Sequence, residues 1–275
     1  MISGWGQDGP DRGLPGFGSL VEARTGFAAM NGFGDRPPVL PPLALADMVA
    51  GLYGGVATLV ALRHREVGGG GGQVIDLPLF DPLLSILGPQ AAQYELTGEV
   101  AQRTGSRSTT TAPRNTYQCA DGRYVALSAS MQSMAERLLR TIGREELIDD
   151  PRFRSNADRV RNNDELDPIV AEFMARRSQA EVLEIFQDAG VTVGPVHDTA
   201  GMLADPLVRE RAVMVRLPDD EMDGLPMHNI AARLSATPGL IRRPAPALGE
   251  HNAEILGQLG LGDGDLAALA KEGVI

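Results

Sequence analysis

An isolated carboxylate within a long apolar stretch is the clearest candidate for chemistry in this sequence. Asp47 is the only charged residue among the twenty residues 43–62, and the polar residues 63–66 (RHRE) end the stretch. At the N-terminus of a helix, the helix dipole and the free backbone amides favour the anionic form of a carboxylate. With glycines nearby to admit a ligand, such an anion can act as a nucleophile.

Two interpretations without chemistry also account for Asp47. As an N-cap of a helix predicted over residues 47–66, it would contribute about 1 kcal/mol by accepting backbone N–H bonds. That helix would be about 30 Å long at 1.5 Å per residue, which is also the thickness of a membrane core. A charged residue costs about 2.5 to 3.5 kcal/mol at the centre of a span, so we expect no membrane association.

Further elements must position this helix, and hydrophobic spacing predicts several of them. After a glycine run at 68–72, residues 74–80 are predicted as a buried strand, and residues 81–97 as an apolar helix. An Asp121-Gly122 turn predicts a hairpin over residues 116–129. The other predicted elements are helices at 131–142, 164–176, 178–189 and 249–260, and strands near 213–217 and 232–234.

The composition limits the class of protein. The chain has 275 residues, 43% of them hydrophobic, which is enough for a substantial core. Its 33 glycines and 19 prolines indicate a loop-rich α/β or α+β protein. A net charge of −11 argues against nucleic acid as a partner. With the single cysteine Cys119 and no recognisable leader, we expect a cytoplasmic protein.

Eight sequence strings, in order, resemble the class III CoA-transferases, the CaiB/BaiF family that includes formyl-CoA transferase. The resemblance covers essentially the whole chain and implies a partial class III CoA-transferase fold. The strings are ISGWGQDGP, PGFGSLVEARTGF, PPLALADMVAGLYGGVATLVALRHRE, GGGQVIDLPLFD, APRNTYQCADGRYVALSA, DDPRFRSNADRVRNNDEL, VTVGPVHDTAGMLADPLVRER and LGEHNAEILGQLG.

The resemblance implies a reaction for Asp47, which matches the catalytic aspartate of the family. Its carboxylate would attack an acyl-CoA to give a mixed anhydride, and CoA would then form an aspartyl thioester before passing to an acceptor acid. The thioester bond energy is conserved in this scheme. Neither a metal nor a permanently bound cofactor is therefore expected, and coenzyme A and acyl-CoA are substrates.

Other positions are expected to contact CoA or the acyl group. The resemblance points to Phe17 and Leu79, to Gly105 in a loop that closes over the intermediate, and to Arg107. Arg107 belongs to a basic cluster with Arg103 and Arg114 that is suited to CoA phosphates or an acid substrate. The histidines show no metal-ligand spacing, so no metal site is predicted.

The resemblance also predicts how the chain is organised. We expect a large-domain segment with the nucleophile helix over 1–97, a small α+β domain over 98–195, and a linker returning to the large domain over 196–275. Family members carry a Rossmann-like half before the segment matching ISGWGQ and form interlocked dimers. We therefore expect a homodimer or a partner chain that supplies this half.

Two alternative functions remain open from the sequence. An acyl-CoA racemase or isomerase would use the same substrates, but Phe17 stands where the related racemases have a catalytic histidine, and a phenyl ring cannot move a proton. A truncated, non-catalytic subunit that binds a partner is the other alternative.

Overall fold

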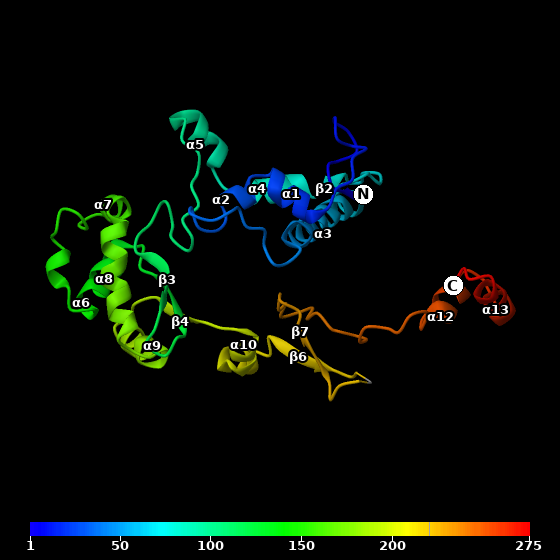
Figure 1. The fold of residues 1–275 in the computed structure, drawn as a ribbon. Helices are drawn as coiled ribbons and strands as arrows, with labels where there is room; N and C mark the ends of the chain where they lie inside the picture. The colour runs from blue at the N-terminus through cyan, green and yellow to red at the C-terminus, as the bar shows by residue number, and fades with distance from the viewer. Residues whose placement is uncertain (220) are drawn as a thin grey trace. The chain divides into compact units, whose positions relative to one another are not determined.

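The computed structural model of the chain describes residues 1–219 and 221–275. It divides into two compact units, Met1–Val196 and His197–Ile275. Helices are mixed with small two- and three-stranded sheets in the described residues (Figure 1). The α/β content expected from the sequence is thereby confirmed. The division at residue 97 within the first unit stays a prediction.

The first part of the first unit is mainly helical, with one pair of short strands. The strands β1 and β2 pair in parallel, Ile2 with Leu77 and Ser3 with Pro78. The elements in this part are β1 (Ile2–Ser3), α1 (Gly18–Arg24), α2 (Phe27–Met30), α3 (Leu45–Glu66), β2 (Leu77–Pro78), α4 (Phe80–Ile86) and α5 (Gln90–Thr97).

The long helix α3 begins two residues earlier than predicted, which corrects the N-cap interpretation of Asp47. Ala44 is the N-cap and Asp47 lies in the first turn. The side chain of Glu22 in α1 accepts a hydrogen bond from the Ala46 N–H at 3.1 Å. A first-turn amide, which no helix can satisfy internally, is therefore bound by a residue distant in the sequence.

The segment after α3 also differs from its prediction. Only Leu77 and Pro78 of the predicted strand 74–80 pair with a neighbour. The helix predicted over 81–97 is two helices, α4 and α5, separated at Gly88 and Pro89. Gly88 adopts the positive φ of 80° that is common after a helix end, and Pro89 has no backbone N–H with which to continue the helix.

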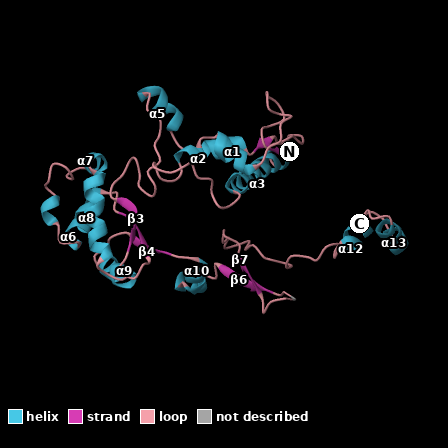
Figure 2. Cartoon of the chain, viewed as in Figure 1, coloured by secondary structure: helices cyan, strands magenta, loops and turns pink. Residues whose placement is uncertain are grey.

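The second part of the first unit packs helices on an antiparallel sheet with strand order β3-β4-β5. The predicted hairpin is confirmed and forms β3 and β4. The helices predicted near 131–142, 164–176 and 178–189 are confirmed as α6, α8 and α9. A further helix, α7, lies in a segment where no helix was expected. Loops of varied length join these elements (Figure 2). The elements are β3 (Arg114–Gln118), β4 (Tyr124–Ser128), α6 (Gln132–Thr141), a 3₁₀ turn (Glu145–Leu147), α7 (Asn156–Arg161), α8 (Asn163–Ala175), α9 (Gln179–Asp188) and β5 (Val193–Val196).

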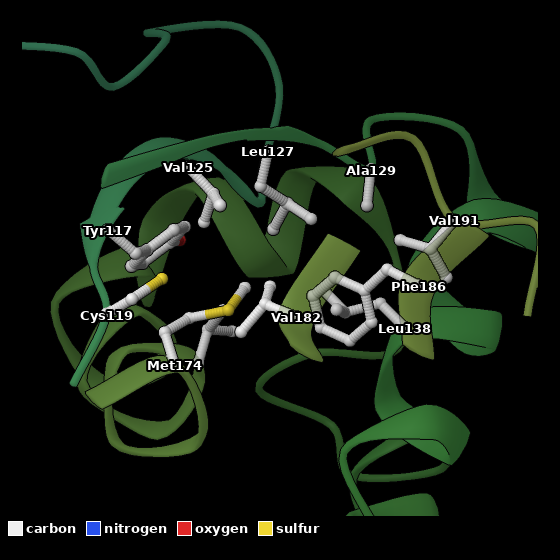
Figure 3. Close-up of a cluster of buried hydrophobic side chains, with 11 residues drawn as sticks. Tyr117, Cys119, Val125, Leu127, Ala129, Leu138, Met174, Val182, Phe186 and Val191 are labelled. Carbon is white, nitrogen blue, oxygen red and sulfur yellow. The ribbon is translucent and has the colours of Figure 1, made fainter. Parts of the chain in front are cut away.

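One face of this sheet forms the largest described core. Alternate strand residues point inward because side chains change face at every position along a strand. Tyr117, Val125 and Leu127 lie on that inner face and pack with Val182 and Phe186 of α9 (Figure 3). The outer face carries the small or polar residues Thr116, Ala126 and Ser128, and also the exposed side chains of Tyr124 and Val196.

A buried carboxylate at Asp167 of α8 organises the polar groups beside this core. It accepts hydrogen bonds from the Tyr117 hydroxyl at 2.7 Å and from the Asn115 amide at 2.8 Å. The Arg107 guanidinium pairs with the same carboxylate. Buried charges are tolerated only when paired and hydrogen-bonded, so this network is a condition for folding of the region.

The second unit contains short elements. Its helices are α10 (Thr199–Ala204), α11 (Pro206–Glu210), α12 (Asn252–Gly257) and α13 (Asp263–Lys271), and its strands are β6 (Met214–Leu217) and β7 (Leu225–His228). The first predicted strand corresponds to β6. The second was predicted wrongly at 232–234, because the chain reverses before Gly224, whose φ is 78°, and the partner strand starts directly after that turn.

The buried Tyr117 hydroxyl should make the stability of the fold fall at alkaline pH. Burial and the neighbouring Asp167 raise the pKa of Tyr117 above its usual value. The unfolded chain releases this proton near pH 10 and the folded chain retains it. The stability from this group is therefore complete below about pH 10 and falls by about 1.4 kcal/mol per pH unit above it.

We expect Tyr117→Phe to lower the free energy of unfolding at pH 7 by about 1 to 2 kcal/mol, because Asp167 loses one hydrogen bond. Above pH 10 the variant should lose stability less steeply than the wild type. Urea unfolding at several pH values measures both effects. If the free energies of unfolding of the variant and the wild type fell in parallel above pH 10, the fold would not be holding the Tyr117 proton.

Candidate active site

Asp47 lies where an anion is favoured. It occupies the first turn of α3 and its side chain is exposed. The positive end of the helix dipole stabilises negative charge in this turn. An exposed anion at this position is chemically able to attack an electrophilic carbonyl.

Gly18 lies against the Asp47 side chain. A Cβ atom at Gly18 would lie 2.3 Å from Oδ2 of Asp47, closer than any non-bonded contact permits. The φ of Gly18 is not in the left-handed region, so the conflict is one of space alone, and the Asp47 carboxylate would have to move to admit a side chain here. The first residue of α1 and the carboxylate of Asp47 are thus in direct contact.

A small core behind α3 fixes the direction of the helix. Ala46 and Ala50 are its buried side, and they pack with Val21 of α1 and with Leu79 and Leu83 near α4. The small alanine side chains let α1 approach α3 closely. Leu79 therefore contributes to the core that supports Asp47.

Phe17 lies directly before Gly18, at the N-cap position of α1. Its side chain is 70% exposed, so it is not part of the core. It is the chain neighbour of Gly18, which contacts the Asp47 carboxylate. The arrangement leaves the ring free to contact an apolar part of a substrate.

The loop bearing Gly105 packs against residues 32 and 33. Gly105 has a φ of 64°, and a Cβ atom there would lie 2.5 Å from the Phe33 ring. Its N–H donates a hydrogen bond to the Gly32 carbonyl at 2.8 Å. This N–H is therefore already engaged in the structure.

The three arginines of the predicted basic cluster have different environments. Arg103 donates to backbone carbonyls of residues 29, 33 and 36, and Arg107 pairs with Asp164 and Asp167. Both therefore serve to hold loops in place. Arg114 makes no side-chain hydrogen bond or ion pair within the described residues.

A groove of about 590 Å³ lies on the outer face of the small sheet, beside Gly105. Arg114 lines it together with Ser106, Thr116 and Ser128. Room for it is left by Thr116, Ala126 and Gly194, which have small side chains or none and are neighbours across the three strands. The groove joins a cation to several hydroxyl groups, which suits a carboxylate or a phosphate.

The structure thus gathers the predicted site residues into two groups. Asp47, Phe17 and Leu79 lie around the contact between α1 and α3, whereas Gly105 and Arg107 lie on the loop beside the small sheet. Residues 29–36 connect the groups through their contacts with Arg103 and Gly105. The described residues contain no cluster of three or more His, Cys, Asp or Glu side chains suited to a metal ion.

The sequence reasoning missed two residues of the first group, Gly18 and Glu22. Both stand in the string PGFGSLVEARTGF, which carried part of the family resemblance. Their spacing of four residues places them on one face of a helix. Nothing in the string indicates that this face meets the first turn of α3.

The fold and this site define the class of protein: residues 1–252 match CoA-transferase family III, and the chain belongs to that family. It is 36% identical over 275 residues to succinyl-CoA–D-citramalate CoA-transferase of Chloroflexus aurantiacus, spanning 100% of this chain and 68% of that protein. It is 34% identical over 278 residues to the beta subunit of succinyl-CoA–L-malate CoA-transferase of the same organism, with the same coverage.

A solved structure shows the same fold. A CAIB/BAIF family protein from Brucella suis superposes with a TM-score of 0.78 at 29% identity, over 94% of this chain and 66% of that one. The chain therefore spans about two thirds of the length of the relatives it matches. The family resemblance inferred from the eight strings is confirmed.

Gly18→Ala should displace the Asp47 carboxylate while leaving the fold intact. The new methyl group would lie 2.3 Å from Oδ2 and push the carboxylate away, and misplacement of a reacting group by about 1 Å can lower a rate by about 100-fold. We expect a loss of this order in CoA transfer, with an unchanged circular dichroism spectrum and melting temperature.

Gly264→Ala is the matched control, because Gly264 also lies in the first turn of a helix, α13, and a Cβ atom there meets nothing within 4 Å. This variant should transfer CoA at the wild-type rate. Equal rates for both variants would show that the contact between Gly18 and Asp47 does not matter for the reaction.

Proposed function

We propose that this chain transfers coenzyme A from an acyl-CoA to a free carboxylic acid, with Asp47 as the nucleophile. The observation that supports this most directly is the exposed Asp47 carboxylate in the first turn of α3, against Gly18. The relatives named for CoA transfer support the reaction class. Phe17 beside the site opposes an α-proton exchange, because its ring carries no titratable group.

Each step of the proposed reaction forms one acyl bond and breaks another. An Asp47 oxygen attacks the thioester carbonyl and CoA leaves as a thiolate, which gives a mixed anhydride. The thiolate attacks the Asp47 carbonyl carbon, forms an aspartyl-CoA thioester and releases the donor acid. The acceptor carboxylate then attacks that thioester, and the expelled thiolate attacks the acceptor acyl carbonyl to regenerate Asp47. Neither ATP nor a metal is consumed.

We propose dicarboxylic acids as the substrate class. The relatives named above act on succinyl-CoA with D-citramalate or L-malate, which all retain a second carboxylate when one end is joined to CoA. The groove at Arg114 offers a cation and hydroxyl groups for that free end. Arg103 and Arg107 are occupied by the fold, so Arg114 is the cation of the predicted cluster that we assign to the substrate.

We also propose that the active unit contains a further polypeptide surface, from a second copy in an interlocked dimer or from a partner chain. The relatives include a protein named as a beta subunit. The outward side of α3 is apolar, with Leu52, Val56 and Leu59 between 63% and 74% exposed. By length and composition α3 could also cross a membrane, and only 11% of its most apolar 18 residues is buried in the structure.

Two features favour a protein surface over a lipid one for α3. Asp47 and several glycines interrupt its apolar length, and the Ala46–Ala50 side already packs on α1. Flotation with neutral phospholipid vesicles distinguishes the two, since a protein partner predicts no binding to vesicles. We propose a cytoplasmic setting, in which the buried Cys119 remains a thiol.

Asp47→Asn should abolish CoA transfer, because an amide lacks the nucleophilic oxygen anion. The assay uses the chain with any co-expressed subunit, succinyl-CoA as donor, and citramalate or malate as acceptor. Without an acceptor, the wild type should accumulate CoA on Asp47, which hydroxylamine converts to a hydroxamate detectable by mass spectrometry on the peptide containing LALADMVAGLYGG.

Asp81→Asn is the matched control, since Asp81 is likewise an aspartate in the first turn of a helix, α4. It should retain full transfer. Comparable turnover by the Asp47 and Asp81 variants would reject Asp47 as the nucleophile, as would unlabelled Asp47 in an assembly that transfers CoA.

Arg114→Ala should weaken binding of dicarboxylate acceptors. A lost hydrogen bond to a charged group corresponds to about 1.5 to 3 kcal/mol, so KM for malate should rise by about tenfold or more. KM for a monocarboxylate such as propionate should stay unchanged. Arg123→Ala, at an exposed arginine after the hairpin turn, is the control, and equal effects on both acids would reject the assignment of the groove.

A further inference from the structure

Glu22 is a buried carboxylate to which the proposed reaction gives no part. It lies in α1 and is 2% exposed, although glutamate is rarely buried without a partner. Its Oε1 accepts a hydrogen bond from the backbone N–H of Ala46 at 3.1 Å. Ala46 directly precedes Asp47 and is itself fully buried.

This hydrogen bond replaces a helix cap. The first amides of a helix have no acceptor within the helix, and an N-cap side chain normally accepts one of them. The N-cap of α3 is Ala44, whose side chain has no acceptor. Glu22 provides the acceptor from another helix, so the bond determines where the first turn of α3 sits on α1.

The same face of α1 contacts the nucleophile itself. Gly18 and Glu22 are four residues apart, so they lie one above the other on the helix. Gly18 touches the Asp47 carboxylate, and Glu22 holds the amide one residue before it. Between them, Val21 packs on Ala46 and Ala50. The first turn of α3 is therefore located at adjacent points on one helix.

We propose that Glu22 is a positioning residue for CoA transfer: its carboxylate fixes the first turn of α3 so that the Asp47 carboxylate rests over Gly18. This inference rests on the proposed role of Asp47 as the nucleophile. Glu22 is buried and acts through the Ala46 amide. Its loss should therefore slow the attack by Asp47 without weakening the binding of acyl-CoA.

The test compares three substitutions of Glu22 in the CoA-transfer assembly. Glu22→Ala removes the acceptor, and Glu22→Asp keeps the charge on a side chain one methylene shorter. Both should lower kcat by about 10- to 100-fold, with KM for succinyl-CoA unchanged. Glu22→Gln keeps an acceptor oxygen at the same reach, so it should restore kcat to within about threefold of the wild type.

Ala23→Gln, at an exposed position on α1, is the control and should behave as the wild type. Thermal unfolding identifies any variant that fails to fold; if Glu22→Ala does, the comparison of Glu22→Asp with Glu22→Gln decides the question. Unchanged kcat in a folded Glu22→Asp, a raised KM as the main effect, or a Glu22→Gln variant as slow as Glu22→Asp would each overturn the proposal.

Asp47→Asn, measured alongside, separates this inference from the proposed function. If the Asp47 variant is inactive and the Glu22 variants are all fully active, Asp47 keeps its role and Glu22 has none. If the Asp47 variant is as active as the wild type, the nucleophile assignment fails, and the Glu22 proposal that depends on it fails with it.

Discussion

The hydrogen bond between the Glu22 carboxylate and the Ala46 amide holds the first turn of α3 against α1, and the geometry around Asp47 depends on it. The two helices can meet this closely because the buried side of α3 consists of Ala46 and Ala50. Protein interiors are packed so densely that a larger side chain at either position would force the helices apart. Close packing and one buried hydrogen bond thus act together on the same turn.

The opposite side of α3 obeys a different constraint. A helix that is apolar nearly all round is ordinarily buried all round, yet this one is covered on one narrow side only. The helix that carries Asp47 therefore also exposes large apolar side chains, among them Leu52, Val56 and Leu59.

The small sheet depends on Asp167 in a comparable way. One buried carboxylate binds a strand, through Asn115 and Tyr117, and a loop, through Arg107. The loop in turn packs its Gly105 on residues 32 and 33. The polar network therefore sets the place of the loop beside the groove, and it leaves Arg114 as a cation with no partner among the described residues.

Local patterns in the sequence determined the elements that are stabilised by their own residues. The hairpin at Asp121-Gly122 and the helices α6, α8 and α9 agree with their predictions, because turn geometry and amphipathic spacing act over a few residues. The sequence also allowed us to infer the family membership and the mixed α/β fold. It identified Asp47, a lone carboxylate in an apolar stretch, as a candidate nucleophile. Helix ends and breaks were less so, since the cap of α3 comes from Glu22 and the break at Gly88-Pro89 divides a continuous apolar pattern.

Only the tertiary structure showed what surrounds Asp47. Gly18 and Glu22 precede it by 29 and 25 positions, and no periodicity links residues so far apart. Their contacts exist because α1 packs across the start of α3, a consequence of burying Val21, Ala46 and Ala50 together. Likewise, three arginines that look equivalent in the sequence are distinguished by their partners in the fold. The sequence by itself singled out Asp47 as the candidate nucleophile; packing between distant segments decided which residues lie against it.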